Sequence, residues 1–272
     1  MFSFETIRPR ISSCPIRGAF FDYDGTVSLI VEGWQDLLTN LFRNTLRQFP
    51  GGDDVSEDRI RQIIDLNTGK KTIAQAVSLV EEVRKLGGNP RSTQEYANEY
   101  LVGLDELTRS RIDEVKSGNR NAHLVPGICE FLAMLKEHGL IICLASGSDE
   151  TVVRNGLEMF GLTEYFDGGI FGTQPNNDDF CKADILDQFL NRFGLKGEEV
   201  VGFGDGYTET KVVHKAGGLA VGIALDEPKR SGINAKRRSR LIEANADWII
   251  SDYTNVKLLE SELFPVSKLK VA

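Results

Sequence analysis

Two aspartates, Asp22 and Asp24, are separated by a single residue and stand directly after the apolar run Gly18–Phe21 and before a Gly25-Thr26 turn. Open α/β sheets bind ligands at the carboxyl ends of their strands, so a strand over this run would deliver Asp22 to a binding edge. A nucleophilic carboxylate beside a second acid suits phosphoryl transfer. An Asp-Gly turn without function has the same residue types, so the interpretation depends on what else the chain supplies.

Two further segments could bind an anion. Ser146 and Gly147 follow the apolar run 140–145, and a hydroxyl with backbone N–H groups at the start of a helix can hold a phosphate. The alternative is an ordinary serine helix cap. Lys182 stands near the start of a predicted helix and could neutralise phosphate charge as a point cation. Taken alone, it would be interpreted as a surface lysine.

A second acidic segment follows the apolar run 200–203. It contains Gly204-Asp205-Gly206, with Glu209 four residues after Asp205. The glycines allow the backbone to approach a ligand closely. Oxygen acids at a strand end suit Mg²⁺, which prefers hard oxygen ligands. An acidic turn without a ligand is the alternative.

In this order, the four segments resemble the four motifs of the haloacid dehalogenase superfamily, and in detail its phosphoglycolate-phosphatase-like branch. The resemblance covers about residues 16–252. It implies an α/β fold, with a Rossmann-like parallel sheet core and an inserted all-helical cap domain. It also implies a Mg²⁺ cofactor and a small phosphorylated metabolite as substrate.

The resemblance implies four catalytic residues. Asp22 would be the nucleophile that forms an aspartyl-phosphate, and Asp24 would protonate the leaving oxygen and then activate water. Ser146 would hydrogen-bond the phosphoryl oxygens, and Lys182 would bridge the phosphoryl group and Asp22. Asp24 must hold a proton when the leaving group departs, so we expect neighbouring carboxylates to raise its pKa.

The resemblance also implies ligands for the metal and the substrate. In the family the second acid of the first motif binds the metal through its main-chain carbonyl. The expected metal ligands are Asp22, Asp24, Asp205 and Glu209. The expected substrate-binding residues are Gly25, Thr26, Gly147, Thr68, Gly69 and Lys70. The family most often has aspartate where this chain has Glu209, and the extra methylene puts direct ligation by this residue in doubt.

The elements that must position these residues follow from the apolar pattern. Strand-like runs alternate with helical segments, which predicts a parallel sheet built from βαβ units. Residues 31–122 have almost no strand-like runs and read as helices, including separate ones over 93–108 and 110–115. We therefore assign residues 14–30 and 123–272 to the core and residues 31–122 to the cap. The ends, residues 1–13 and 267–272, are expected to be loose.

The cap contains one segment of interest, residues 67–72. It resembles a P-loop, but Ile64 stands where that motif requires its first glycine, so we reject nucleotide binding there. In helical-capped relatives a similar loop contacts the substrate, which is the basis for including Thr68, Gly69 and Lys70. The alternative is a polar turn between helices.

Composition narrows the class of protein. The net charge of −8 argues against a nucleic-acid partner, and we interpret the basic run 236–240 as the solvated face of a helix. No apolar run approaches the roughly 20 residues that span a bilayer. The four cysteines show no CxxC spacing, and residues 1–15 lack a signal-peptide layout. These observations favour a cytoplasmic protein without membrane segments.

The sequence therefore predicts a Mg²⁺-dependent phosphatase for a small phosphorylated metabolite, such as a sugar phosphate or phosphoglycolate. The nearest alternative is a phosphomutase, which shares the first half-reaction. A third possibility is a non-catalytic protein that binds a phosphorylated metabolite. The sequence indicates no oligomeric state.

Overall fold

The computed structural model describes residues 2–9, 14–67, 72–174 and 180–265. The chain forms two compact units, one made of Met1–Leu29 with Arg120–Ala272 and the other of Ile30–Asn119. No helix in the described part of the chain has the length and apolar character needed to cross a membrane.

The first unit contains a seven-stranded sheet within its described residues. The strands are β1 (Phe4–Thr6), β2 (Gly18–Phe21), β3 (Ile141–Asp149), β4 (Gly169–Thr173), β5 (Val200–Gly204), β6 (Leu219–Ile223) and β7 (Trp248–Ile250). Their order is β1-β7-β6-β5-β2-β3-β4, and every neighbouring pair is parallel except β1 with β7. The predicted α/β class with a parallel sheet is confirmed.

Strand β1 corrects one expectation. Residues 1–13 were expected to be loose, but Phe4 pairs with Ile250 and Thr6 with Trp248 in an antiparallel ladder. The ring of Phe4 also lies edge-on to Trp248, with centroids 5.3 Å apart. The expectation failed because three residues are too few for a periodic pattern to show, and the pairing partner lies at the far end of the chain.

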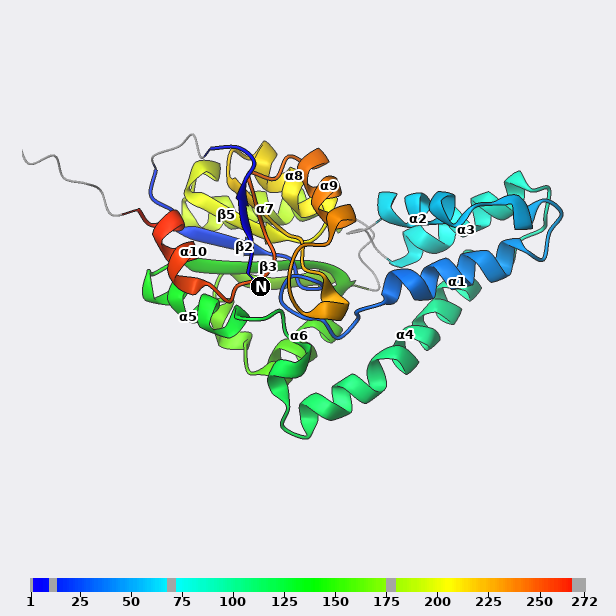
Figure 1. The fold of residues 1–272 in the computed structure, drawn as a ribbon, viewed down its shortest axis with the longest axis horizontal. Helices are drawn as coiled ribbons and strands as arrows, with labels where there is room; N and C mark the ends of the chain where they lie inside the picture. The colour runs from blue at the N-terminus through cyan, green and yellow to red at the C-terminus, as the bar shows by residue number, and fades with distance from the viewer. Residues whose placement is uncertain (1, 10–13, 68–71, 175–179, 266–272) are drawn as a thin grey trace, which may run out of the picture. The chain divides into compact units, whose positions relative to one another are not determined.

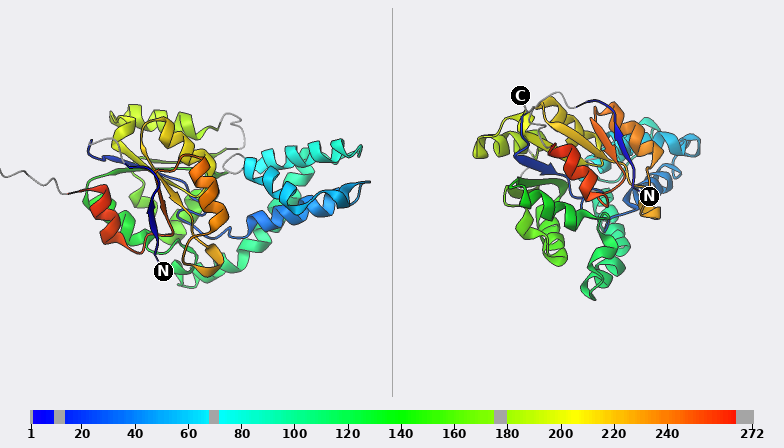
Figure 2. Two further views of the ribbon diagram at one scale, coloured as in Figure 1. Left: turned by 45° about the horizontal axis from the view of Figure 1, so that its top comes forward. Right: turned by 60° about the vertical axis from the view of Figure 1, so that its left-hand side comes forward.

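Helices cover both faces of the sheet. Helices α7 (Lys182–Phe193), α8 (Tyr207–Lys215) and α9 (Ala235–Glu243) lie on one face. Helices α5 (Ile128–Glu137), α6 (Glu150–Phe160) and α10 (Val256–Leu263) lie on the other (Figures 1 and 2). Successive side chains of β2 pack against opposite faces of the sheet. Phe20 packs with Phe189 of α7, whereas Phe21 stacks on Phe203 and contacts Phe166. This alternation is the period of two that a strand imposes.

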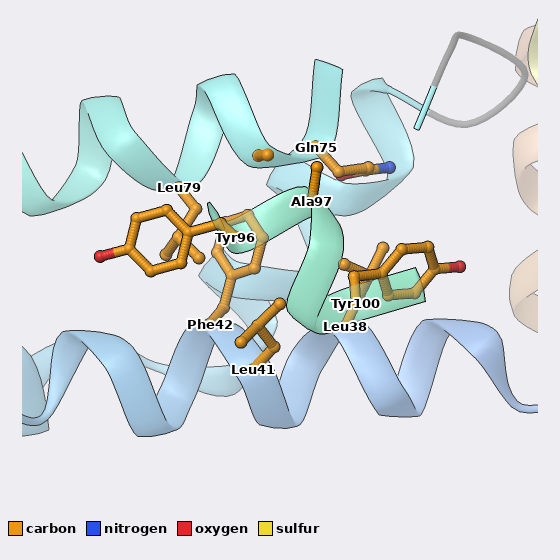
Figure 3. Close-up of a pocket in the computed structure, with 9 residues that line it drawn as sticks. Leu38, Leu41, Phe42, Gln75, Leu79, Tyr96, Ala97 and Tyr100 are labelled. Atoms are coloured by element: carbon orange, nitrogen blue, oxygen red, sulfur yellow. The ribbon is translucent and has the colours of Figure 1, made fainter. Parts of the chain in front are cut away.

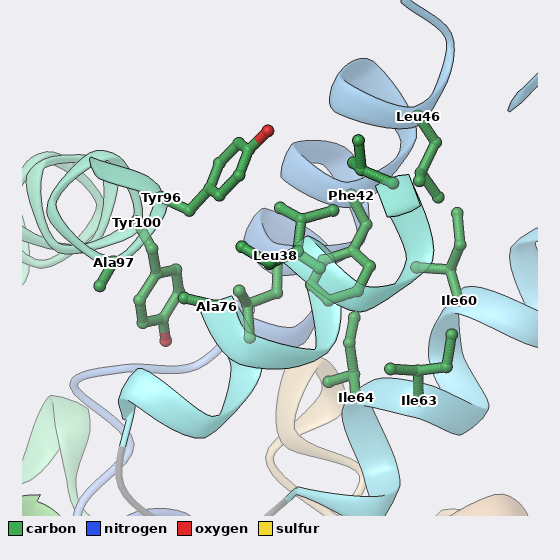
Figure 4. Packing of buried hydrophobic residues seen from close by; sticks show 13 residues of the cluster. Leu38, Phe42, Leu46, Ile60, Ile63, Ile64, Ala76, Tyr96, Ala97 and Tyr100 are labelled. Atoms are coloured by element: carbon green, nitrogen blue, oxygen red, sulfur yellow. The ribbon is translucent and has the colours of Figure 1, made fainter. Parts of the chain in front are cut away.

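The second unit is a bundle of four helices in its described residues. They are α1 (Trp34–Leu46), α2 (Glu57–Leu66), α3 (Thr72–Lys85) and α4 (Thr93–Lys116). Their apolar faces meet in one core, and Figure 4 shows side chains such as Phe42, Ile64 and Tyr100 converging there. Helix α4 is continuous, so the prediction of two helices over 93–108 and 110–115 was wrong. It begins with a capping box between Ser92 and Glu95.

A small cavity lies among these helices. Its lining includes Phe42, Gln75 and Tyr96 (Figure 3). The Gln75 amide donates a hydrogen bond to the Ile64 carbonyl at 3.0 Å. The cavity measures about 10 Å³, which is room for one water at most. It is too small for a metabolite, so this core is packing rather than a binding site.

A substitution at Gly127 would show how tightly the first unit is packed around this residue. It precedes α5 with φ of 81°, and a Cβ there would lie 2.5 Å from the backbone carbonyl carbon of Tyr253. Gly139 follows the same helix with φ of 75° and has no atom within 4 Å of such a Cβ. We expect Gly139→Ala to cost about 1–2 kcal/mol through backbone strain alone. Gly127→Ala should cost at least about 2 kcal/mol more, because a backbone must move.

The measurement is urea unfolding of the two variants and the unmodified protein. Equal losses of stability in the two variants would show that the contact between Gly127 and Tyr253 is not tight.

Candidate active site

Asp22 lies at the carboxyl edge of the sheet because β2 ends at Phe21. Its backbone N–H donates a hydrogen bond to the Phe203 carbonyl of β5 at 2.9 Å. Strand β2 runs between β3 and β5, with Phe21 in register with Leu144 and Phe203. The residues that follow all three strands therefore gather at one edge, as parallel strands require.

Lys182 is the cation of this edge. It is the first residue of α7, and its Nζ lies 2.8 Å from Asp22 Oδ1 and 3.0 Å from Glu209 Oε2. The residue is only 2% exposed, and lysine is almost never buried so fully without charged partners. Burial by itself lowers the pKa of Lys182, but the attraction of Asp22 and Glu209 outweighs it and raises the pKa above its usual range. The surface-lysine interpretation is therefore wrong, and Lys182 is a buried cation between two acids.

Asp24 is held by a serine without an assigned role in the sequence-based prediction. Ser148 Oγ donates to Asp24 Oδ2 at 2.6 Å, and the Ser148 N–H donates to Ser146 Oγ at 3.1 Å. Strand β3 has an irregular register between Ala145 and Asp149, and this irregularity carries both serines at its end. The only sequence signal for Ser148 is its spacing of two from Ser146.

The pKa of Asp24 is raised, as expected, but for a different main reason. Burial is the largest cause, and Glu227 adds to it, whereas hydrogen bonds from Ser148 and Ser146 and the charge of Lys182 lower the pKa. The predicted rise from a neighbouring carboxylate is present through Glu227, but it is smaller than the effect of burial. A carboxyl that is buried yet hydrogen bonded can hold a proton and still present it in a defined direction.

Three acids form a cluster that could hold a metal ion. Carboxylate oxygens of Asp22, Asp205 and Glu209 lie within 4.8 Å of one another, and all three residues are buried. The set offers only oxygen donors, which fits Mg²⁺ better than softer metals. Asp24 is not in this cluster, because its side chain turns to Ser148. Metal binding through its main-chain carbonyl stays a prediction.

The acids of the cluster differ in pKa. Burial raises the pKa of Asp22 well above its ordinary value, and repulsion from Glu209 and Asp205 adds to this against the attraction of Lys182. Burial likewise raises the pKa of Asp205 to about 6, although Arg237 opposes it. Burial also acts on Glu209, but Lys182 and backbone donors outweigh it and lower the pKa. Burial and mutual repulsion therefore disfavour ionisation of Asp22 and Asp205, and a bound cation would offset that repulsion.

Glu209 fits the site because two glycines make room for it. Its Oε1 accepts a hydrogen bond from the Gly206 N–H, while its Oε2 faces Lys182. A Cβ on Gly204 would lie 2.0 Å from Glu209 Cγ, and one on Gly206 would lie 2.5 Å from Glu209 Oε1. The longer side chain is therefore folded back on its own loop. It brings its carboxylate to Lys182 and into the acidic cluster.

Arg237 was missed by the sequence reasoning. Its side chain is only 10% exposed, and its Nη2 lies 3.5 Å from Asp205 Oδ2. Its Nη1 donates to Glu227 Oε1 at 2.8 Å. The prediction that residues 236–240 form a solvated face is therefore wrong for Arg237. In contrast, the Arg238 side chain is 39% exposed and pairs with Glu5. Neighbouring residues of this basic run therefore point to different places, Arg237 to the site and Arg238 to the surface.

The remaining predicted residues are placed as follows. Gly25 has φ of 73°, and a Cβ there would lie 2.5 Å from Asp205 Oδ2. Thr26 is fully buried, and its N–H donates to the Tyr23 carbonyl at 3.3 Å. Gly147 lies between the two serines. Thr68, Gly69 and Lys70 lie outside the described residues.

Comparison with known proteins identifies the family. The sequence model described as haloacid dehalogenase-like hydrolase matches residues 16–217. The chain belongs to the haloacid dehalogenase-like hydrolases. The predicted superfamily is confirmed by this match. The search of curated proteins gave no match.

Solved structures share the fold of this hydrolase. A predicted phosphoglycolate phosphatase from Haemophilus somnus has a TM-score of 0.62 at 17% identity, over 91% of this chain and 99% of that one. A β-phosphoglucomutase from Clostridium difficile has a TM-score of 0.60 at 17% identity, over 91% and 97%. A haloacid dehalogenase-like protein from Agrobacterium tumefaciens has a TM-score of 0.59 at 17% identity, over 90% and 98%. At such identities the likeness concerns the fold.

The raised pKa of Asp205 predicts a pH dependence of stability in this hydrolase. The folded protein binds a proton at Asp205 more tightly than the unfolded chain, whose value is near 3.8. Ionisation of Asp205 therefore costs stability as the pH rises through about 6, and below the unfolded value that cost is absent. Asp205→Asn removes it. We expect the stability of the variant relative to the unmodified protein to rise between about pH 4 and about pH 6 and to level off above that range.

Urea unfolding in the presence of EDTA measures this difference. A difference in stability that stays constant over the pH range would contradict the raised pKa.

Proposed function

We propose that this hydrolase is a Mg²⁺-dependent phosphatase that acts on a small phosphorylated metabolite through a phosphate ester of Asp22. The observation that carries the proposal is the contact of buried Lys182 with both Asp22 and Glu209, beside the acid Asp205. A nucleophilic acid, a fixed cation and a further acid at one strand edge meet the needs of phosphoryl transfer.

In the first step a carboxylate oxygen of Asp22 attacks phosphorus, and the bond from phosphorus to the ester oxygen breaks. Asp24 gives its proton to that oxygen, which leaves as an alcohol. The buried position of Asp24 supports this role because it raises the pKa and keeps the proton available. Lys182 neutralises charge on Asp22 and on the phosphoryl group throughout, and Ser146 hydrogen-bonds a phosphoryl oxygen.

In the second step Asp24, now ionised, takes a proton from a water that attacks the same phosphorus. The bond from phosphorus to Asp22 breaks, inorganic phosphate leaves, and both acids return to their starting states. The hydrogen bond from Ser148 keeps Asp24 Oδ2 in place through both steps. Dividing hydrolysis into two displacements at one carboxylate is nucleophilic catalysis.

Asp22, Asp205 and Glu209 would hold the Mg²⁺, and the Asp24 carbonyl would add a ligand. The ion would supply positive charge that offsets the repulsion between the acids and an anionic substrate. The N–H groups of the Gly25-Thr26 turn and of Gly147 are proposed to bind the phosphate. The segment containing Thr68, Gly69 and Lys70 is proposed to contact the rest of the substrate.

A phosphomutase is the second candidate, because Asp24 would serve it equally and a β-phosphoglucomutase shares the fold. It would return the phosphoryl group of Asp22 to a sugar instead of water. Products distinguish the two, since a phosphatase releases inorganic phosphate from each turnover.

The test is to incubate the protein with Mg²⁺ and each member of a panel of phosphate monoesters, and to measure the release of inorganic phosphate. We expect EDTA to abolish turnover and excess Mg²⁺ to restore it. Asp22→Asn should lower kcat by roughly 10⁴-fold or more, because the nucleophile is lost. Asp187→Asn, at an exposed position of α7, is the control and should leave kcat unchanged.

Turnover that persists in Asp22→Asn would exclude Asp22 as nucleophile. An isomeric sugar phosphate in place of inorganic phosphate would favour the phosphomutase. Tight binding of a phosphorylated metabolite without any turnover would show a binding protein.

A further inference from the structure

Arg237 reaches the acidic cluster from a part of the chain outside the four motifs. Its helix α9 is anchored where it begins, since the Arg237 N–H donates to Asn234 Oδ1 at 3.0 Å and the Asn234 N–H donates to the Ala224 carbonyl at 2.7 Å. Ala224 directly follows strand β6. The guanidinium therefore projects from a backbone that the sheet holds in place.

The guanidinium has partners on two sides. Nη2 faces Asp205 Oδ2 at 3.5 Å, whereas Nη1 faces Glu227 Oε1 at 2.8 Å and the Leu225 carbonyl at 3.4 Å. The side chains of Arg237, Asp205 and Glu227 are each about 10% exposed. A planar fork with several fixed donors can bridge two carboxylates, which the single ammonium of a lysine does less well. Glu227 thus orients Arg237, and Arg237 contacts Asp205.

The loop that follows Asp22 also confines the Asp205 side chain. Because Gly25 has no Cβ, its backbone passes close to Asp205 Oδ2 and Glu227 Oε1, at 2.5 and 3.2 Å from the position that a Cβ would take. The Asp205 carboxylate therefore lies between the loop of the nucleophile and the guanidinium of Arg237. These contacts on Oδ2 limit rotation of the Asp205 carboxylate.

We propose that Arg237, held by Glu227, is a positioning residue that orients the Asp205 carboxylate for Mg²⁺. The proposal rests on the metal site of the proposed function and extends it to two residues that the motifs do not contain. Carboxylates that bind metals are themselves commonly hydrogen bonded, and loss of such a partner weakens metal binding about 10- to 100-fold.

The test is calorimetric titration of Mg²⁺ into the full-length protein and its variants. In Arg237→Met we expect the Kd for Mg²⁺ to rise about 10-fold or more, because Asp205 loses its support. Arg237→Lys keeps the charge but loses the fork, so we expect an intermediate Kd. Glu227→Gln keeps an oxygen that accepts from Arg237 and should change the Kd less than Arg237→Met does.

Arg238→Met is the matched control, since Arg238 is the next residue of α9 and pairs with Glu5 instead. Its Kd should stay within about 2-fold of the unmodified protein. Thermal unfolding in EDTA identifies the variants that remain folded. If Arg237→Met does not fold, the Kd values of Arg237→Lys and Glu227→Gln are compared with that of the unmodified protein instead.

The direction in which the Kd for Mg²⁺ changes in Arg237→Met distinguishes two possible roles of Arg237. A cation that only repels Mg²⁺ predicts tighter binding in Arg237→Met, and tighter or equal binding overturns the proposal. A Kd for Arg237→Lys equal to that of the unmodified protein also overturns it, because charge without the fork would then suffice. If the unmodified protein binds no Mg²⁺, the metal site of the proposed function fails, and this role of Arg237 fails with it.

Discussion

The contact of Lys182 with Asp22 and Glu209 is the interaction on which the site depends. Three acids within 4.8 Å of one another repel strongly once water is removed. One buried ammonium at 2.8 and 3.0 Å from two of them offsets part of that repulsion. Removing one partner of a buried ion pair leaves an uncompensated charge and typically costs 3–5 kcal/mol. A bound divalent cation would offset the remaining repulsion.

The backbone of the sheet brings these charged residues close together, so their side chains do not have to extend far to meet. Strands β3, β2 and β5 lie side by side and parallel, so the residues that follow them meet at one edge. Glycines at the strand ends then set how close the loops approach. Gly25 admits Asp205, and Gly204 admits Glu209, so two of the acids occupy space that any larger residue would fill. The position of the acids is thus a consequence of backbone packing as much as of side-chain attraction.

Around the acids, neighbouring side chains determine how each carboxylate is directed. Ser148 contacts Asp24 and Lys182 contacts Asp22, while Arg237 faces Asp205. Ser148 and Lys182 donate hydrogen bonds, whereas Arg237 forms an ion pair. The three partners come from different elements, so each acid is directed separately. Such support from neighbouring groups is what holds reactive residues within the narrow geometry that catalysis requires.

The sequence alone determined the alternation of strands and helices and the order of the four polar segments, because apolar periodicity and short motifs are local properties. It also pointed to Asp22, Asp24, Lys182 and Asp205. Only the tertiary structure decided that Ser148 contacts Asp24, that Arg237 leaves a basic run to face Asp205, and that Phe4–Thr6 joins the sheet beside β7. Those three facts depend on partners more than 30 residues away, and no local pattern records which distant backbone a side chain will meet.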